Sequence, residues 1–561
     1  MLRNWLLTAI RGFGRNKLST FINILGLTVG LSSCLVIALF IRHELSYDDF
    51  EVKGPRIVRL IMQYRFGGGG DMQAGNFTST HVAPTFQQVF PEVESGVRMG
   101  DREEIVQYQE KLFKEQRFMF ADSSFFLAFS MPLVEGDPRS ALSGPHKLVM
   151  TRSAARRYFG NADPVGKIVR VGTDSSNYEV TGLMADCPSN SQIKFDLLAS
   201  FSSLYDNDNP TYWDANYTTF LLLKDKNDIA PLQAKVTAFM KKEMQGKGAE
   251  VNFLLEPFMS IHLHSPYPGF EPGTSIVYIY VLASVALLIL VIAGATYINL
   301  STARSVDRAR EVGVRKVIGA GKGQLFWQFI GESLLLCLVA VILSLGVVLL
   351  VLPAFNRLAD RQLPWQMVLS PLFLLVSLGI GLVVGLLAGS YPALVLSRFH
   401  PVKVLKGAFK NTRSGQGLRQ SLIVFQFAIS IFLIVATFIM GQQLSYIRHR
   451  DLGFDRDHVV ELPMDYSLQS KIDYIKTEFT RNPDVLTVTE CSSSPVAIHG
   501  GYNMRNTLMS DDQQLAVFGD PVDADFIATT GLKLVAGEGI SKQDMIDANP
   551  ADTATKPRFA F

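Results

Sequence analysis

The chain has 561 residues, of which 48% are hydrophobic and 19% are charged, and its formal net charge is +2. Its positive mean hydropathy makes it too apolar for an ordinary soluble protein, and it is too charged to lie entirely in a membrane. The basic residues gather in short segments beside apolar runs, a pattern that indicates membrane topology and excludes a nucleic-acid-binding protein.

No pattern for metal binding or covalent catalysis stands out. The four cysteines have no metal-ligand or redox spacing, and the nine histidines form no His-Glu-x-x-His motif or Cys/His cluster. The polar regions contain no G-x-S-x-G elbow or similar nucleophile-and-base pair. We therefore expect no catalytic residue, no metal and no cofactor bound by this chain.

The first 41 residues predict a surface helix followed by a first transmembrane helix. Residues 1–20 mix Arg and Lys with apolar side chains and no acid, which is typical of an amphipathic helix on the cytoplasmic surface. Residues 21–41 are apolar enough for a first transmembrane helix. A cleaved signal peptide competes, but charged residues beginning at Arg42 follow directly. A lipoprotein box ending at Cys34 also competes, but the apolar run continues beyond that cysteine.

Residues 42–275 are polar and, with the N-terminus inside, form an extracytoplasmic domain of mixed α/β type. Short β-like runs alternate there with helical stretches. The strand candidates are 56–62, 167–171 and 178–183, and the helix candidates are 83–90, 153–159 and 231–244. One of these helices is expected to start near Thr151 and to stop at Gly160.

Four more apolar runs predict transmembrane helices, and a short external turn is expected at 356–361. The runs cover 276–298, about 325–352, about 367–388 and 418–441. The fourth helix carries repeated glycines that predict a face for close helix packing; a glycine-lined substrate path is the alternative. These glycines are Gly379, Gly381, Gly385 and, just beyond the predicted end, Gly389.

The polar loop 303–322 between the second and third helices is the part of the chain that we most expect to contact a partner. Between Arg304 and Lys322 it holds six basic and two acidic residues, and loops of this kind stay on the cytoplasmic side. The spacing of its arginines predicts a short amphipathic helix that ends at the glycines from Gly319. The alternative is that the charges only fix topology. Gly321 and Lys322 lack the flanking residues of a phosphate-binding loop.

The loop resembles a known family signature. The matching residues are Asn299, Ser305, Arg308, Arg310-Glu311-x-Gly313, Arg315-Lys316, Gly319-Ala320, Gln328 and Glu332. They resemble the signature loop of FtsX-like permeases, the membrane subunits of MacB-type ABC transporters; Val317 departs from the Ala of many members. Segments 147–160, 163–167, 178–182 and 188–195 are similar to the MacB-like periplasmic core domain.

The resemblance implies a multi-pass permease subunit of a bacterial inner membrane, with residues 276–406 as the permease module. Its loop would be a coupling helix on a separate cytoplasmic ABC ATPase, so that ATP is bound by the partner subunit and the chain is not an enzyme. The coupling residues so implied are Arg304, Arg308, Arg310, Glu311, Gly313, Arg315, Lys316 and Gly319. Arg310, Glu311 and Arg315 are expected to contact the ATPase, while Gly313 and Gly319 shape the loop.

Further partners and rival functions remain open. Besides the lipid bilayer, periplasmic or outer-membrane components fit, as does a dimeric assembly or a pseudo-dimer within a longer chain. One rival is a transporter whose substrate crosses through the helices, but apart from Glu332 and the uncharged Gln426 the spans hold almost none of the buried ionisable residues that such a path predicts. The other is a ligand-binding membrane sensor without an ATPase partner.

Residues 442–561 resemble the start of the external domain. Five residues from Asp122 to Gly136 recur from Asp523 to Gly537 at a constant offset of 401. We therefore predict a tandem duplication with a second, incomplete periplasmic core domain, and a chain that is a fragment. The fold class expected is an α-helical integral membrane protein with large mixed α/β extracytoplasmic domains.

Overall fold

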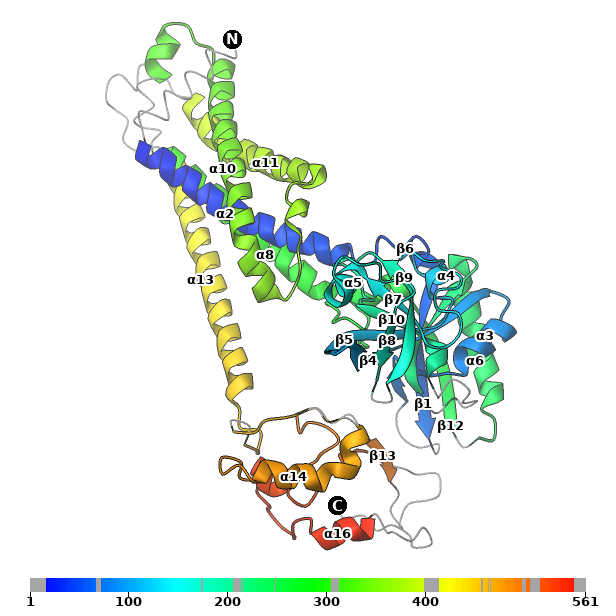
Figure 1. Ribbon diagram of the computed structural model, residues 1–561. Coiled ribbons are helices and arrows are strands. Elements are labelled where there is room, and N and C mark those ends of the chain that lie inside the picture. The colour runs from blue at the N-terminus through cyan, green and yellow to red at the C-terminus, as the bar shows by residue number, and fades with distance from the viewer. Residues whose placement is uncertain are drawn as a thin grey trace. The chain divides into compact units, whose positions relative to one another are not determined.

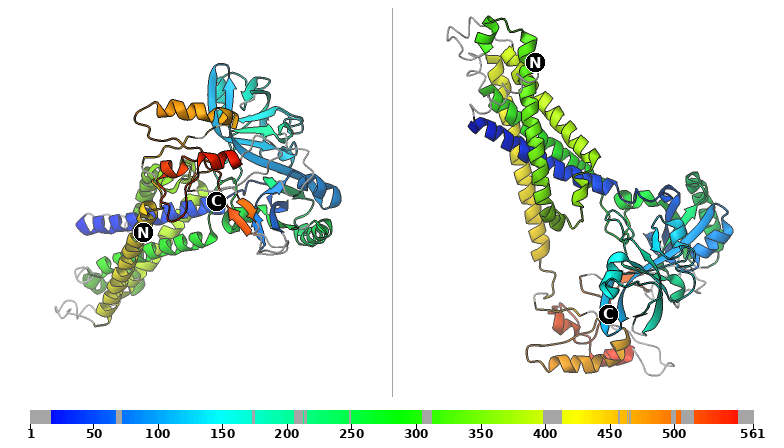
Figure 2. Two further views of the ribbon diagram at one scale, coloured as in Figure 1. Left: turned by 90° about the horizontal axis from the view of Figure 1, so that it is seen from below. Right: turned by 45° about the horizontal axis from the view of Figure 1, so that its top comes forward.

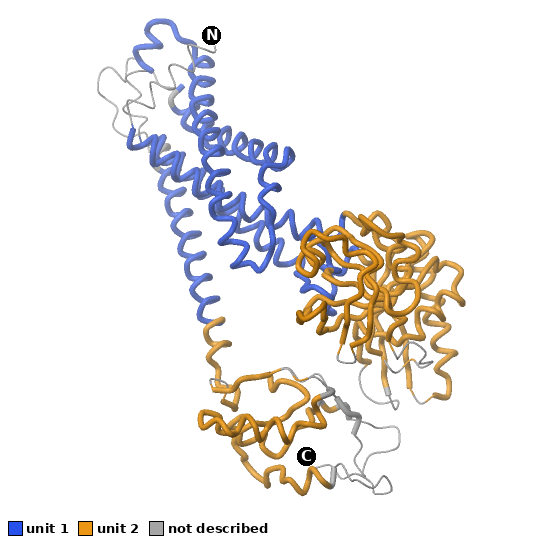
Figure 3. The backbone as a smooth tube through the Cα atoms, viewed as in Figure 1, with its two compact units in different colours: residues 1–49, 188–193, 259–443 blue, residues 50–187, 194–258, 444–561 orange. Residues whose placement is uncertain are grey.

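The computed structural model divides the chain into two compact units (Figure 3). The first unit holds residues 1–49, 188–193 and 259–443, and the second holds 50–187, 194–258 and 444–561. The structure describes residues 17–66, 72–172, 175–204, 212, 215–247, 249–303, 312–397, 413–455, 458–462, 464, 466–496, 501–504 and 515–548. The amphipathic helix predicted for residues 1–20 lies outside the described residues up to position 16.

Five helices in the described part of the chain are long and apolar enough to cross a membrane, as the sequence predicts. They are α2 (Lys17–Leu45), α8 (Ile276–Ala303), α10 (Lys322–Ala359), α11 (Pro371–Ser397) and α13 (Arg413–His449). A short helix, α7 (Ile261–His264), precedes α8. Four of the five helices, α2, α8, α10 and α11, pack together around a shared apolar core.

The helices extend past most ends of the apolar runs that predicted them, and α10 and α11 are two examples. The turn expected at 356–361 is wrong, because α10 stays helical to Ala359 and ends only where Asp360 adopts a left-handed conformation (φ +49°). The fourth membrane helix begins at Pro371 and continues through Pro392 to Ser397. The apolar run underestimates helix length because capping, and not hydropathy, sets where a helix stops.

The membrane helices are drawn from two further sides in Figure 2, and small residues allow α10 and α11 to approach closely. A Cβ atom at Gly389 would lie 2.6 Å from the Cβ of Ser333 on α10, and one at Gly385 would lie 3.3 Å from Cys337. Gly381 meets Val341 in the same way, so the predicted packing face of the fourth helix is confirmed at three of its glycines. Gly379 has no atom within 4 Å of its added Cβ. The pair α2–α8 uses the same device where Gly30 meets Ala293.

In the second unit a mixed sheet forms the external domain (Figure 1). The strand order is β12-β1-β11-β4-β5-β10-β7-β9-β6, with β2, β3 and β8 pairing beside it. The strands are β1 (Ile57–Phe66), β2 (Gln73–Gly75), β3 (Thr78–Ser79), β4 (Val93–Tyr108), β5 (Lys111–Ala121), β6 (Leu133–Glu135), β7 (Lys147–Thr151), β8 (Ile168–Val171), β9 (Ser176–Met184), β10 (Leu197–Ser200), β11 (Ala215–Leu223) and β12 (Ala249–Pro257). Most neighbours are antiparallel, and β10 with β5 and β7 with β9 are parallel.

Four helices accompany this sheet, namely α3 (Val82–Val89), α4 (Phe125–Ala128), α5 (Arg152–Phe159) and α6 (Ile229–Glu243). Buried side chains of α3 and α6, among them Phe86 and Val236, pack on β1 and β12. On the other half of the sheet Ala154 and Tyr158 of α5 pack against residues of β5, β7 and β9. The strands and helices predicted from 56 to 244 are therefore confirmed.

Helix α5 follows the local signals in its sequence. The Thr151 hydroxyl accepts a hydrogen bond from the backbone N–H of Ala154 at 3.3 Å, and Gly160 (φ +65°) ends the helix. A hydroxyl at the N-cap satisfies a donor that the first helical turn leaves unpaired, and glycine tolerates positive φ without strain. The predicted start near Thr151 and stop at Gly160 are confirmed.

The segment after α13 holds shorter elements. They are α14 (Ile472–Thr480), β13 (Gly501–Met504), β14 (Leu515–Phe518), α15 (Phe526–Thr530) and α16 (Lys542–Ala548). The Asp523 carboxylate accepts a hydrogen bond from the Glu490 N–H at 2.9 Å, and its own N–H donates to the Glu490 carbonyl. Lys476 of α14 forms an ion pair with the same carboxylate.

The glycine face of α11 predicts how the helix bundle responds to a single methyl group. Gly389→Ala should lower the free energy of unfolding by about 1–3 kcal/mol, because the new Cβ forces α10 and α11 apart. Thermal unfolding of the purified protein in detergent measures the change. Gly379→Ala is the matched control and should not lower the melting temperature, since its Cβ meets nothing and Ala favours a helix. Equal losses in both variants would contradict the packing face.

Candidate functional site

The link between α8 and α10 contains a short helix at residues 312–317, called here the loop helix. It ends in a turn in which the Gly319 and Ala320 N–H groups donate to the carbonyls of Lys316 and Arg315. Gly319 has φ +104°, a conformation that strains other residues, and Gly321 then caps the start of α10. The predicted helix end at these glycines is confirmed.

The inner face of the loop helix is apolar. Val312 is buried and packs with Leu325, Phe329 and Ile330 of α10 and with Ala393 of α11. Gly313 is also buried. Because burial of apolar surface stabilises the contact, the loop helix is held on the inner ends of two membrane helices.

Two basic side chains add directional tethers. Arg315 Nη1 donates to Gln328 Oε1 at 2.9 Å, and Gln328 Nε2 donates to Glu332 Oε1 at 3.3 Å, so a polar ladder runs from the loop helix along α10. Lys316 Nζ donates to the carbonyl of Ser397, the last residue of α11, at 2.6 Å. A cation suits the negative end of a helix dipole. Desolvation and the nearby charge of Lys322 lower the pKa of Lys316.

The outer face of the loop helix exposes apolar side chains. Val314 is 50% exposed, Val317 66% and Ile318 80%. Positions i, i+3 and i+4 lie on one side of a helix, so the three side chains form one patch. A hollow of about 340 Å³, lined by Arg315, Ile318, Gly319, Ala320 and Gln324, adjoins it. An exposed apolar patch on a charged loop is a feature of a surface that another molecule covers.

The residues predicted for this site divide into two groups. Gly313, Arg315, Lys316 and Gly319 lie together in and after the loop helix, whereas Arg304, Arg308, Arg310 and Glu311 lie outside the described residues. Arg315, predicted as a partner contact, here donates to Gln328 within the same chain. The apolar outer face was missed, although the spacing of Val314, Val317 and Ile318 in the basic run is the signal that could have found it.

The described residues of this loop form neither a metal site nor a phosphate-binding loop. Among the described residues no group of three or more His, Cys, Asp or Glu side chains could hold a metal ion. Gly321 and Lys322 begin a long membrane helix, and the residue that follows them is glycine and not Ser or Thr. The described loop residues instead fix the loop helix on α10 and α11.

Two family models match the chain. The MacB-like periplasmic core domain matches residues 20–239, and the FtsX-like permease C-terminal domain matches residues 283–401. The second match includes the loop helix and the membrane helices that hold it.

The chain is similar to curated proteins and to a solved structure. The chain is 26% identical over 264 residues to the macrolide export ATP-binding/permease protein MacB of Bdellovibrio bacteriovorus, which covers 46% of this chain and 38% of that protein. It is 23% identical over 420 residues to the protein of the same name from Chromobacterium violaceum, covering 71% and 60%. The periplasmic region of MacB from Actinobacillus actinomycetemcomitans matches at 15% identity and a TM-score of 0.25, covering 34% of this chain and 87% of that one. The chain spans less than two thirds of these curated relatives.

The tether from Lys316 predicts how firmly the loop helix is held. Lys316→Met should speed amide hydrogen exchange across residues 312–320 by about tenfold, because a charge-assisted hydrogen bond to α11 is lost. Hydrogen–deuterium exchange with mass spectrometry on the purified protein measures it. Lys322→Met removes an exposed lysine a few residues away and should leave that exchange unchanged. If both variants exchange at the wild-type rate, the Lys316 contact holds nothing.

Proposed function

The chain belongs to the MacB/FtsX-like family of ABC transporter permeases, and from that membership we propose that it works as a membrane subunit driven by a separate cytoplasmic ABC ATPase. It is an inner-membrane protein with a large extracytoplasmic domain. In this proposal the partner binds and hydrolyses ATP, and the present chain is not itself an enzyme. Its role is to convert the partner's movement into conformational work or export in the periplasm.

The observation that carries the proposal is the two-sided loop helix. Its inner face is packed on α10 and α11 and is tethered by Arg315 and Lys316. Its outer face presents Val314, Val317 and Ile318 to solvent. A segment that is rigidly joined to the membrane helices and apolar on its free side suits a docking surface through which a push is passed on.

The residues before the loop helix complete the proposed surface. Arg304, Arg308, Arg310 and Glu311 would add charged contacts around the apolar patch, which set orientation and encounter rate more than affinity. Gly313 and Gly319 would shape the segment, and Arg315 and Lys316 would hold it in place. The free energy of binding would then come from the apolar side chains at the centre.

The assignment of segments is part of the proposal. Residues 1–20 would be a cytoplasmic surface helix, and residues 21–41 and 418–441 would be the first and fifth transmembrane helices. Residues 42–275 would form a periplasmic core domain. Residues 276–406 would form the permease module, with its coupling loop at 303–322. Residues 442–561 would belong to a second periplasmic core domain. Periplasmic or outer-membrane components, and a dimer or an internal pseudo-dimer, are proposed as further partners.

Matching hydrogen bonds support a tandem duplication. In the first domain the Asp122 carboxylate accepts from the Arg98 N–H at 2.8 Å, and in the second segment Asp523 accepts from the Glu490 N–H at 2.9 Å. In both places the N–H of the aspartate donates to the carbonyl of that same partner residue.

Strand pairing and helix starts recur in the same register. Met99 pairs with Ala121, and Cys491 pairs with Val522, each one residue after the bonded backbone and one before the aspartate. The helices α4 and α15 then begin at Phe125 and Phe526, both three residues after the aspartate. The ion-pair partner differs, since Arg98 serves Asp122 and Lys476 serves Asp523.

If a partner docks on the apolar patch, a charge placed in that patch should reduce complex formation and ATPase activity. In full-length protein co-purified with a candidate ATPase, Ile318→Asp should reduce complex formation and permease-dependent ATPase activity by roughly tenfold or more, because a carboxylate would be buried in an apolar contact. Leu112→Asp, at an exposed leucine of the external hairpin, is the matched control and should leave both unchanged. Glu311→Lys tests the charged part of the surface in the same assay.

The same measurement separates the alternative function. If the partner binds and hydrolyses ATP equally with wild type, Ile318→Asp and Glu311→Lys, the loop only determines topology. A ligand-binding membrane sensor without an ATPase partner then becomes the better description.

The duplication predicts equal roles for two aspartates. Asp122→Asn should speed hydrogen exchange of the Arg98 amide about tenfold, and Asp523→Asn should do the same for the Glu490 amide, because each change weakens a charge-assisted hydrogen bond to the side-chain carboxylate. Residue-resolved hydrogen exchange measures both. A response at Arg98 with none at Glu490 would argue that the second turn is not the equivalent of the first.

A further inference from the structure

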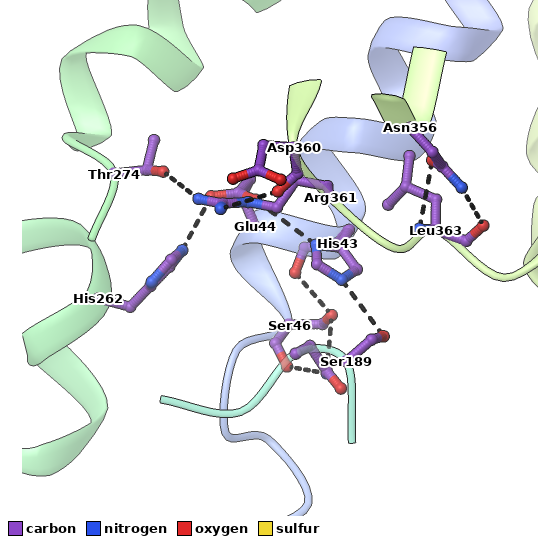
Figure 4. Close-up of polar contacts among 11 residues, drawn as sticks. His43, Glu44, Ser46, Ser189, His262, Thr274, Asn356, Asp360, Arg361 and Leu363 are labelled. Atoms are coloured by element: carbon purple, nitrogen blue, oxygen red, sulfur yellow. Dashed lines mark hydrogen bonds and ion pairs between the residues drawn. The ribbon is translucent and has the colours of Figure 1, made fainter. Parts of the chain in front are cut away.

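Within the first unit, a buried polar cluster joins three membrane helices at their outer ends (Figure 4). Glu44 near the end of α2 lies at its centre with an exposed fraction of 0%. The groups around it come from α2 and the residues after it, from the segment leading into α8, and from the loop after α10. They are His43, Tyr47, His262, Thr274 and Arg361.

The two oxygens of Glu44 face different parts of the bundle. Oε2 lies 2.9 Å from His262 Nε2, and Oε1 accepts from Arg361 Nε at 2.9 Å. Arg361 Nη2 also donates to Thr274 Oγ1 at 3.4 Å. A buried carboxylate is tolerated only when it is paired, so both contacts stabilise the ionised Glu44.

On the His262 side the cluster is held by closely packed aromatic rings. The Tyr47 and His262 rings stack with centroids 3.4 Å apart and planes 4° from parallel, and His43 meets Tyr47 edge-on. Burial raises the pKa of Tyr47 to about 12, so its phenol is neutral at physiological pH. Where α2 crosses α8, Gly30 meets Ala293 with no space between them. These contacts make α2, α7 and the start of α8 one body.

A second set of bonds fixes the chain that follows Glu44. Asp48 accepts from Gln192 N at 3.0 Å and from Gln192 Nε2 at 2.8 Å, and Asn190 Nδ2 donates to the Ser46 carbonyl at 2.6 Å. The segment that follows Glu44 is therefore held in place by residues 190–192.

On the other side Arg361 belongs to the α10–α11 pair, which is joined by the glycine face. Its backbone N–H donates to the Asn356 carbonyl, and the Asn356 side chain exchanges two hydrogen bonds with Leu363, which sets the loop. The Arg361 side chain is 16% exposed, whereas that of Glu44 is fully buried. Arg361 can therefore turn toward water, and Glu44 would keep His262 as a partner.

The remaining contacts between the two helix pairs at this end are weaker or less directional. Leu35 and Leu39 of α2 pack against Val348 and Leu352 of α10, and apolar contacts of this kind permit sliding. Arg42 Nη1 donates to the Ser370 hydroxyl at 3.0 Å, which is a single bond to a neutral group. The Glu44–Arg361 ion pair is thus the strongest directional link between the pairs at their outer ends.

We propose that the Glu44–Arg361 ion pair is a latch between the helix pairs α2–α8 and α10–α11. When closed it holds the outer ends of the two pairs together, and when it opens α10 and α11 move against α2 and α8. His262 stays with Glu44 in both states. This inference goes beyond the proposed function and does not depend on an ATPase partner.

The test measures distances in the full-length protein in lipid nanodiscs. Cys187 and Cys491 are replaced by Ser, and spin labels are attached at exposed pairs that either cross the latch, Leu45 and Leu358, or lie within one body, Leu45 and Val277. Arg361→Gln should broaden the Leu45–Leu358 distribution and shift it to longer distances, and it should leave the Leu45–Val277 distribution unchanged. Arg357→Gln, which removes an exposed arginine near the end of α10, should alter neither.

Two results would overturn the latch. An unchanged Leu45–Leu358 distribution in Arg361→Gln means that the ion pair does not restrain the helix pairs, and equal broadening of both distributions means that the cluster holds the whole bundle and not one interface. If Arg361→Gln does not fold, Glu44→Gln weakens the same ion pair without removing the hydrogen-bonding group, and the same two distributions decide.

Discussion

A buried carboxylate is tolerated only when charged or hydrogen-bonding groups pair with it, and this constraint shapes the outer end of the membrane bundle. Glu44 satisfies it with His262 on one side and Arg361 on the other. Because these partners lie far apart in the chain, pairing them requires α2, α8 and the loop after α10 to meet at one point. Deeper in the bundle the same helices pack closely through small residues.

The inner end of the same bundle is built on the opposite principle. There the polar tethers of Arg315 and Lys316 are directed inward, toward α10 and α11, and the apolar side chains Val314, Val317 and Ile318 are left outside. Helix α10 connects the two ends as one continuous element of 38 residues. Pro353 lies inside this helix near its outer end, where it removes a backbone hydrogen-bond donor. Under the proposed function, a displacement at the loop helix is passed along α10 toward the Arg361 loop.

Sequence reasoning succeeded where one local property decides the outcome. Apolar length found the membrane helices, and a hydroxyl at Thr151 with a glycine at 160 marked the two ends of α5. Gly381, Gly385 and Gly389 indicated a packing face because only the absence of a side chain permits such proximity. It was less successful at helix ends, since the extension of α10 to Ala359 depends on a left-handed Asp360 and on bonds from Asn356 to Leu363.

The sequence by itself determined the class of protein, the number of apolar helices in the described part, the mixed α/β external domain and the family signature, since each rests on composition, periodicity or residues close together in the chain. Only the tertiary structure decided the roles of individual side chains. Arg315 holds the loop helix on α10 because Gln328 lies beside it. Glu44 links α2 to α7 and to the loop after α10 because His262 and Arg361 both contact its carboxylate. Charge and hydrogen bonding act through space over a few ångströms, so a residue's partner is unknown until the chain has folded.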